Sequence, residues 1–111
     1  MKDYHIYLED ILESIEKIER YLHGVKPAGF GTNDSLQDSI IRRLAIIGEA
    51  VKQLPTSVTE KYPTIPWKKI AGMRDILVHD YAGVQIERVW RTTQNDLPKL
   101  KQVVTKIKEQ K

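Results

Sequence analysis

Apolar residues recur at alternating spacings of three and four along several stretches of the chain, which is the period of an amphipathic α-helix. The first stretch follows Asp3, a candidate N-cap, and ends before Gly24 and Pro27, both of which disfavour a helix. Charged residues fill most of its other positions, so we expect this helix to bury one face and expose the other. The apolar stripe consists of Tyr4, Leu8, Ile11, Ile15, Ile18 and Leu22.

A second amphipathic stretch begins at Asp34, where Gln37 three residues later indicates a capping box, and it stops at Pro55. The Gly- and Pro-rich segment before it, up to Asn33, is expected to be a loop. Gly48 lies inside this helix, where glycine costs about 1 kcal/mol relative to alanine. A neighbouring backbone that approaches closely would account for this glycine. The stripe consists of Leu36, Ile40, Leu44, Ile47, Val51 and Leu54.

Two further helices follow a short helical turn expected within residues 56–62. The third helix starts at Pro66 and Trp67, with Trp67 expected in the core or a subunit interface, and it ends within residues 78–81. The last helix starts near Val84, and its apolar phase continues across Pro98, which predicts a kink and not a break. Its stripe consists of Ile86, Trp90, Thr93, Leu97, Leu100, Val104 and Ile107. The pattern therefore predicts an all-α, antiparallel bundle of four main helices.

The totals narrow the class of protein without fixing its function. A chain of 111 residues is enough for one hydrophobic core, so we expect a single helical domain over residues 1–111. It contains no cysteine, which excludes disulfides, a thiol nucleophile and a cysteine-built zinc site. With no signal-like or membrane-spanning segment, a soluble cytoplasmic protein without membrane association is expected. A net charge of +3 and a pI near 9.1 favour polyanion binding only mildly.

The candidate chemistry lies in the third helix and just after it, where Arg74, His79 and Tyr81 stand beside strongly apolar residues. A guanidinium can hold two phosphate oxygens in its fork, and a histidine can exchange a proton at neutral pH. On a regular helix Arg74 and His79 lie about 140° apart, so one helix does not bring them onto one phosphate. Either the chain turns back near Val78, or a symmetry mate supplies a second copy of the motif.

The spacing Arg74-x4-His79-x-Tyr81 resembles the signature of HEPN-domain proteins, specifically the HepT-like toxins that pair with a minimal nucleotidyltransferase antitoxin. The surrounding blocks occur in the order that is associated with this family, and the resemblance covers nearly the whole chain. These blocks are Ile47-Gly48-Glu49-Ala50, Val51 to Pro55, Pro66-Trp67 and Ile70 to Arg74. The resemblance implies a HEPN-like homodimer with the motif in a cleft at the dimer interface.

This resemblance also implies a function: the toxin of a type II toxin–antitoxin system, a metal-independent endoribonuclease that needs no cofactor and is neutralised by the nucleotidyltransferase. Arg74 would clamp the phosphate of the RNA substrate and His79 would serve as the general acid–base group. Asp75, where the family is associated with asparagine, would orient His79, and Glu49 would support the site from the second helix. Tyr81 would either contact substrate or accept AMP from the antitoxin (AMPylation).

A second hypothesis from another class stays open. The same spacing could serve a non-catalytic helical module whose Tyr81 surface docks a nucleotidyltransferase or binds a nucleotide. The modest net charge and the lack of a basic platform rich in aromatic residues keep this alternative in view. A purely structural role, in which Arg74, Asp75 and His79 only cap and pair at a helix end, is the third possibility.

Overall fold

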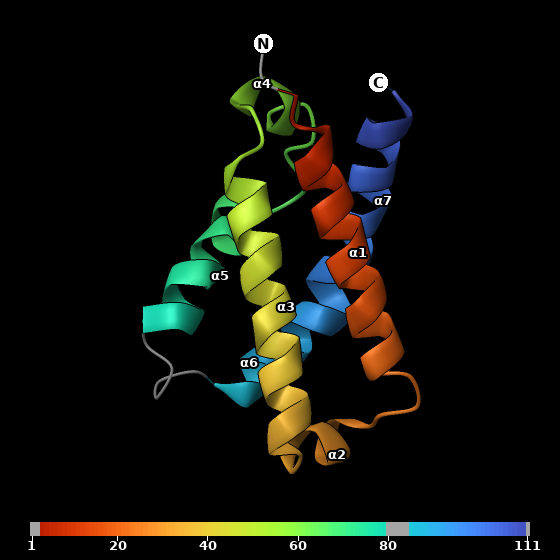
Figure 1. Ribbon diagram of the computed structural model, residues 1–111, viewed down its shortest axis with the longest axis vertical. Helices are drawn as coiled ribbons and strands as arrows, with labels where there is room; N and C mark the ends of the chain where they lie inside the picture. The colour runs from red at the N-terminus through yellow and green to blue at the C-terminus, as the bar shows by residue number, and fades with distance from the viewer. Residues whose placement is uncertain (1–2, 80–84, 111) are drawn as a thin grey trace.

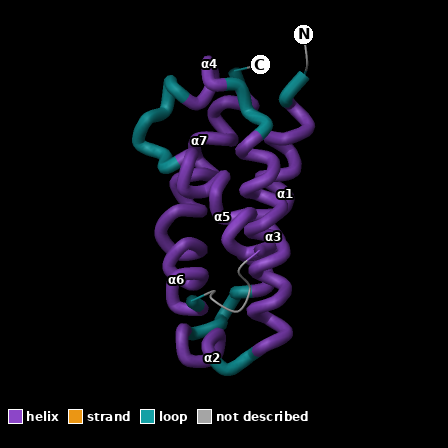
Figure 2. Tube along the Cα trace, turned by 90° about the vertical axis from the view of Figure 1, so that its left-hand side faces the viewer, coloured by secondary structure: helices purple, strands orange, loops and turns teal. Residues whose placement is uncertain are grey.

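The structure, a computed structural model, describes residues 3–79 and 85–110, of residues 75–79 only the backbone. This part of the chain is helical apart from short connections, and it contains no β-strand (Figure 2). None of its helices is both long and apolar enough to cross a bilayer. The elements are α1 (His5–Tyr21), α2 (Pro27–Gly31), α3 (Asp34–Lys52), α4 (Thr56–Thr59), α5 (Trp67–His79), α6 (Ile86–Arg91), the π-helical turn η2 (Thr92–Asp96) and α7 (Leu97–Glu109).

The long helices run alternately up and down (Figure 1). Helix α3 packs against α1 on one side and α5 on the other, and α7 packs on α1. The short helix α2 lies at one end of the bundle and α4 at the other. The predicted all-α, antiparallel bundle is therefore confirmed, with two extra short helices. The hydrophobic residues that are at most 1% exposed form the centre of the core, with less fully buried residues around them: Leu8, Ile11, Ile15, Phe30, Ile40, Leu44, Ile47, Ile70, Leu100 and Val104.

The starts of both α1 and α3 correct the sequence-based caps: the N-cap of α1 is Tyr4 and not Asp3. The Asp3 carboxylate accepts a hydrogen bond of 2.9 Å from the backbone N–H of His5, the first residue of α1. At α3 the N-cap is Asn33 and not Asp34, because the Asn33 side chain accepts the N–H of Leu36 at 3.0 Å. Gln37 does not close a capping box with Asp34, since its amide donates to the Phe30 carbonyl at 2.8 Å.

The predicted loop before α3 is wrong in part, since it contains the helix α2. Pro27 occupies the first turn of α2, where a missing N–H costs nothing. Phe30 is 1% exposed, and its ring lies 5.4 Å from that of Trp90 on α6, centroid to centroid. Burial of this one aromatic side chain gives the segment a reason to fold that no local periodicity reveals. Gly24 adopts a φ of +74°, which agrees with its predicted role in ending α1.

The last predicted helix departs from regular α-helical geometry just before Pro98, where a kink was predicted. The chain stays helical from α6 through η2 into α7, and Pro98 lies in the first turn of α7 directly after the π-helical turn. Proline has no N–H to donate, and its ring clashes with the carbonyl of the residue four positions earlier in a regular α-helix. A wider π-helical turn before Pro98 makes room for the ring where the hydrogen bond is missing. The hydroxyls of Thr92 and Thr93 donate to the carbonyls of Arg88 and Trp90, at 3.1 and 2.6 Å.

The connection before α5 is fixed at several points. The predicted turn is present as α4, and the indole N–H of Trp67 donates to the Tyr62 carbonyl at 3.0 Å. Trp67 is half-buried against the core, as predicted. The Tyr62 hydroxyl is 3.1 Å from the Gln110 side-chain oxygen after α7. Within α5, Lys69 reaches Asp96 of η2 at 3.1 Å. These contacts fix where α5 begins.

An ion pair joins α1 to α7. Lys101 donates to Glu19 at 2.9 Å. This hydrogen bond, opposed by partial burial and helped by the charges of Glu19 and Glu16, raises the pKa of Lys101 above 10.5. Both side chains are more than a third exposed, so solvent screening keeps the pair's contribution to stability small.

The cap of α3 gives a direct test of the structure. We expect Asn33→Ala to lower the free energy of unfolding by about 1 kcal/mol, because the N–H of Leu36 loses its acceptor. Asp34→Ala should cost less, about 0.3–0.5 kcal/mol, since Asp34 contributes only its charge to the first turn. Urea unfolding followed by circular dichroism measures both. The opposite order would place the cap at Asp34.

Candidate functional site

The site is built where α5 lies against α3, at Gly48. A Cβ atom placed on Gly48 would lie 2.8 Å from the Ile70 carbonyl oxygen and 3.2 Å from both the backbone nitrogen and Cβ of Arg74. Such contacts are too short for alanine unless a helix moves. The predicted close approach of a backbone at Gly48 is thus confirmed, and the approaching backbone is that of α5 at Ile70 and Arg74.

Arg74 meets Glu49 across this contact. The Arg74 Nε atom lies 3.4 Å from Glu49 Oε2, and the two side chains are 38% and 52% exposed. Pairs with such exposure contribute little to stability, typically about 0–1 kcal/mol. Glu49 therefore acts on Arg74 mainly by orienting the guanidinium, which lies on the surface at the edge between two helices. The expected support of Arg74 by Glu49 from the second long helix has a geometric basis here.

Helix α5 keeps its register through the histidine of the motif. Its backbone is helical from Trp67 to His79, so Arg74 and His79 stay about 140° apart around the axis. The backbone therefore does not turn back before His79, and the supply of a second motif by a symmetry mate stays a prediction. The side chains of Asp75 and His79, and the whole of Tyr81 and the predicted breaker Gly83, lie outside the described residues.

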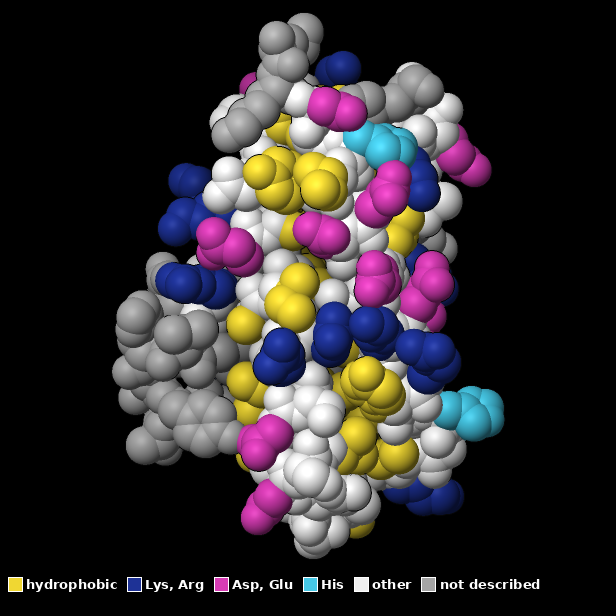
Figure 3. All heavy atoms as spheres, viewed as in Figure 1, with side chains coloured by type: hydrophobic (Ala, Val, Ile, Leu, Met, Phe, Trp, Pro, Cys, Tyr) yellow, Lys and Arg dark blue, Asp and Glu magenta, His cyan; other side chains and the backbone are white. Residues whose placement is uncertain are grey.

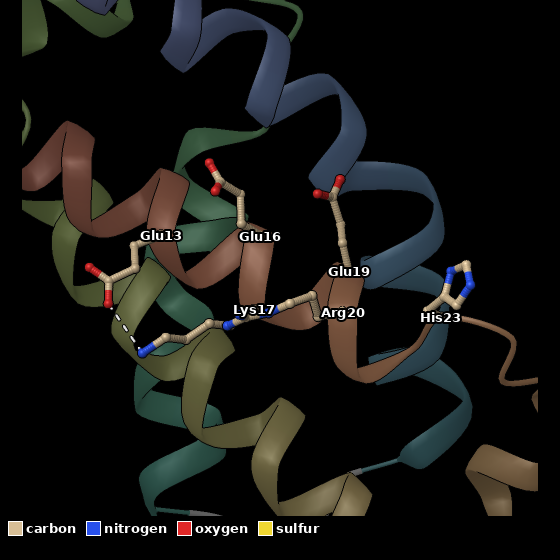
Figure 4. Close-up of a pocket in the computed structure, with 6 residues that line it drawn as sticks. All are labelled: Glu13, Glu16, Lys17, Glu19, Arg20 and His23. Atoms are coloured by element: carbon tan, nitrogen blue, oxygen red, sulfur yellow. Dashed lines mark ion pairs between the residues drawn. The ribbon is translucent and has the colours of Figure 1, made fainter.

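Two of the hollows in the described surface lie away from Arg74 and Glu49. One of about 670 Å³ lies along α1 and is lined by Glu13, Glu16, Lys17, Glu19, Arg20 and His23 (Figure 4). Another of about 240 Å³ lies between α1 and the π-helical turn, with Thr93 and Gln94 as its polar lining beside Glu19. Among the described side chains, no group of three or more His, Asp or Glu residues could hold a metal ion. An exposed arginine on an interhelical edge is thus the clearest candidate for chemistry.

An all-α bundle that carries its motif at the end of the third long helix is the architecture expected of a HEPN-like domain. A family profile described as "Ribonuclease HepT-like" matches residues 11–107. The chain belongs to this HepT-like ribonuclease family.

Individual relatives agree. A "Gamma-glutamylcyclotransferase and putative RNase" of Methanocaldococcus jannaschii is 50% identical over 109 residues, which is 98% of this chain and 49% of the relative. The chain thus spans about half the length of that relative. A "Probable ribonuclease HepT" of Thermococcus cleftensis is 41% identical over 103 residues, covering 93% of this chain and 94% of the relative. A "Putative RNase" of Caldanaerobacter subterraneus is 41% identical over 107 residues, or 96% of each chain. No solved structure matches with comparable significance.

The contact at Gly48 predicts a strong effect of a small substitution. Gly48→Ala should lower the free energy of unfolding by about 1–3 kcal/mol, because the added methyl group pushes α5 away from α3. Gly29→Ala is the control: the new Cβ would meet only Val25, at 4.0 Å, so stability should change little or rise. Denaturant unfolding measures both. Equal stability of the two variants would show that α5 does not need the close approach.

Proposed function

We propose that this protein is a metal-independent endoribonuclease, the toxin of a type II toxin–antitoxin system, and that it acts as a homodimer. The observation that carries the proposal is the placement of Arg74 on the surface, against Gly48 and beside Glu49, five residues before His79 on the same helix. Membership of a family with relatives named as RNases supports RNA as the substrate.

The chemistry follows from the residue types. A base removes the proton of an RNA 2′-hydroxyl, and the resulting oxygen attacks the adjacent phosphorus. The bond to the 5′-oxygen breaks, that oxygen takes a proton from an acid, and a 2′,3′-cyclic phosphate remains. His79 moves the proton as base or acid, since imidazole titrates near neutral pH. Arg74 holds two phosphate oxygens and stabilises the negative charge that gathers on them. Asp75, one turn before His79, orients the imidazole.

The proposal requires two copies of the chain. Arg74 and His79 are separated by about 140° around α5 and by about 7.5 Å along it, so a single helix presents them to different regions. Gly72 supports a second copy at this helix: among the described residues, nothing lies within 4 Å of a Cβ placed there. A glycine inside a helix costs about 1 kcal/mol. Close approach of a partner helix would account for Gly72, as α3 accounts for Gly48.

Purified wild-type protein is expected to cleave single-stranded RNA in EDTA. His79→Ala should lower the rate constant by about 10²–10⁴-fold, the usual contribution of a general acid–base group. Arg74→Lys should also be impaired, because lysine keeps the charge and loses the planar fork. His5→Ala is the control histidine; its imidazole lies 2.9 Å from Glu9, in the first turns of α1. Full cleavage by His79→Ala would exclude the proposed role, and a wild-type protein that cuts nothing would favour the binding-module hypothesis.

Mixing two inactive variants tests whether the active site is shared. If Arg74 of one protomer works with His79 of the other, a heterodimer of Arg74→Ala and His79→Ala contains one intact site. With random exchange of equal amounts, about a quarter of the wild-type activity should return. If both residues act from the same protomer, mixing restores nothing. Size-exclusion chromatography of each variant establishes beforehand that both form dimers.

The antitoxin is proposed to act on Tyr81. Attack of the Tyr81 hydroxyl on the α-phosphate of ATP would attach AMP and release pyrophosphate. The added anionic nucleotide would obstruct the cleft and repel RNA. Co-expression with a minimal nucleotidyltransferase should increase the protein mass by one AMP and abolish cleavage, whereas Tyr81→Phe should keep its mass and any cleavage it has. An unmodified but inhibited wild-type protein would show that the partner acts by docking alone.

A further inference from the structure

A row of Lys and Arg side chains crosses α1 and α3 on one face of the bundle (Figure 3). Two cations, Arg42 and Arg43, lie near the middle of α3. Arg42 precedes Glu49 by seven residues, or nearly two turns, so both lie on the same exposed stripe of the helix. Because Glu49 contacts Arg74, the stripe of Arg42 leads directly to the candidate site.

Arg43 continues the row toward α1. It shares a stripe with Ala50, which lies about 200° around α3 from Gly48, the residue that faces α5. Since α1 and α5 flank α3, this stripe borders α1. The two helices are antiparallel, so the first half of α3 lies beside the second half of α1. That half carries Lys17 and Arg20, whose side chains extend toward α3 (Figure 4).

Three carboxylates accompany the four cations of this row: Glu13 on α1, Asp38 one turn before Arg42, and Glu49. Within the described part of the chain, no hydrogen bond or ion pair engages the side chains of Arg20, Arg42 or Arg43. Lys17 pairs with Glu13 at 3.1 Å. Glu16 and Glu19 extend away from α3 (Figure 4), and Glu19 pairs with Lys101 at 2.9 Å. Four cations against three carboxylates leave the side toward α3 with a small net positive charge, which suits a polyanion; Arg20 and Arg42 are exposed, and Lys17 and Arg43 are partly buried.

An aromatic side chain accompanies the cations. Tyr21 follows Lys17 by one turn of α1, so the two lie on the same face of that helix. Tyr21 is 38% exposed and is one of two large hydrophobic side chains exposed among the described residues, the other being Ile6. Cations along a strand with an exposed aromatic ring among them are typical of surfaces that bind single-stranded nucleic acid, because bases can stack on the ring.

We propose that Lys17, Arg20, Arg42 and Arg43 hold successive phosphates of single-stranded RNA, which runs from Arg74 across α3 to α1 and stacks one base on Tyr21. The inference rests on the proposed function for the identity of the ligand. A guanidinium fork takes two oxygens of one phosphate, and a row of forks matches a chain with one charge per nucleotide. Contacts to phosphates carry no sequence information. The row therefore distinguishes single-stranded from double-stranded RNA and does not distinguish one base sequence from another.

The double variant Arg42→Gln/Arg43→Gln tests this surface, with Lys106→Gln/Lys108→Gln on α7 as a control of equal charge change. Both are made in a His79→Ala background, so that a labelled, unstructured 20-nucleotide RNA survives while its binding is followed by fluorescence anisotropy. The double variant should bind about tenfold more weakly, and its salt slope should fall by about 1.4, the value for two lost phosphate contacts on a single strand. Tyr21→Leu should weaken binding without changing the slope, and duplex RNA should compete poorly.

The outcomes separate this surface from the catalytic proposal. With His79 restored, the Arg42→Gln/Arg43→Gln protein should cleave a dinucleotide at the wild-type rate and the long RNA more slowly at low concentration. If the wild-type protein cleaves RNA but the double variant and its lysine control bind RNA equally well, the proposed RNA-binding row is wrong and the nuclease proposal stands. If the double variant binds RNA more weakly but the wild-type protein cleaves nothing, the RNA-binding row is supported and the nuclease proposal is wrong. A double variant that keeps RNA and loses a nucleotidyltransferase would make this a protein-docking surface and overturn the inference.

Discussion

The contact of α5 with the backbone of α3 at Gly48 is the constraint on which the site depends. A missing Cβ lets the Ile70 carbonyl and the Arg74 backbone come within a distance that any other residue would prevent. The next residue along α3, Glu49, then reaches the Arg74 guanidinium. Packing and chemistry are therefore coupled through two adjacent residues. The glycine sets the distance between the helices, and the glutamate orients the charge that this distance brings to the surface.

Much of this arrangement could be predicted from the sequence, because burial imposes a period that the chain displays directly. Most residues of the two predicted stripes form the core, while Tyr4, Leu22 and Leu36 are partly buried against it. The cost of a glycine inside a helix correctly pointed to a close contact. Family membership, expected from the spacing of Arg74, His79 and Tyr81, is confirmed by the comparison with known proteins. The roles of these three residues stay predictions.

What the sequence could not reveal depends on contacts between distant segments. Asn33 and Asp34 are both good caps, and only the conformation of the chain entering α3 selects the first. Phe30 stands alone in a Gly-rich segment, so its burial against Trp90 leaves no periodic signal. Arg42 and Arg43 look like an ordinary solvated face until the antiparallel packing of α1 and α3 places them beside Lys17 and Arg20. Each of these features depends on which helices and loops pack against one another in the fold.

The positions of the first and last long helices bear on how this domain can be combined with others. The start of α1 and the end of α7 lie at the same end of the bundle, opposite α2 (Figure 1). One relative is about twice as long as the stretch it shares with this chain. A domain attached at either end would extend the molecule away from α2 and from the last turn of α5. Fusion to another domain is thus compatible with leaving the surface around Arg74 uncovered. The bundle could therefore be joined to different domains.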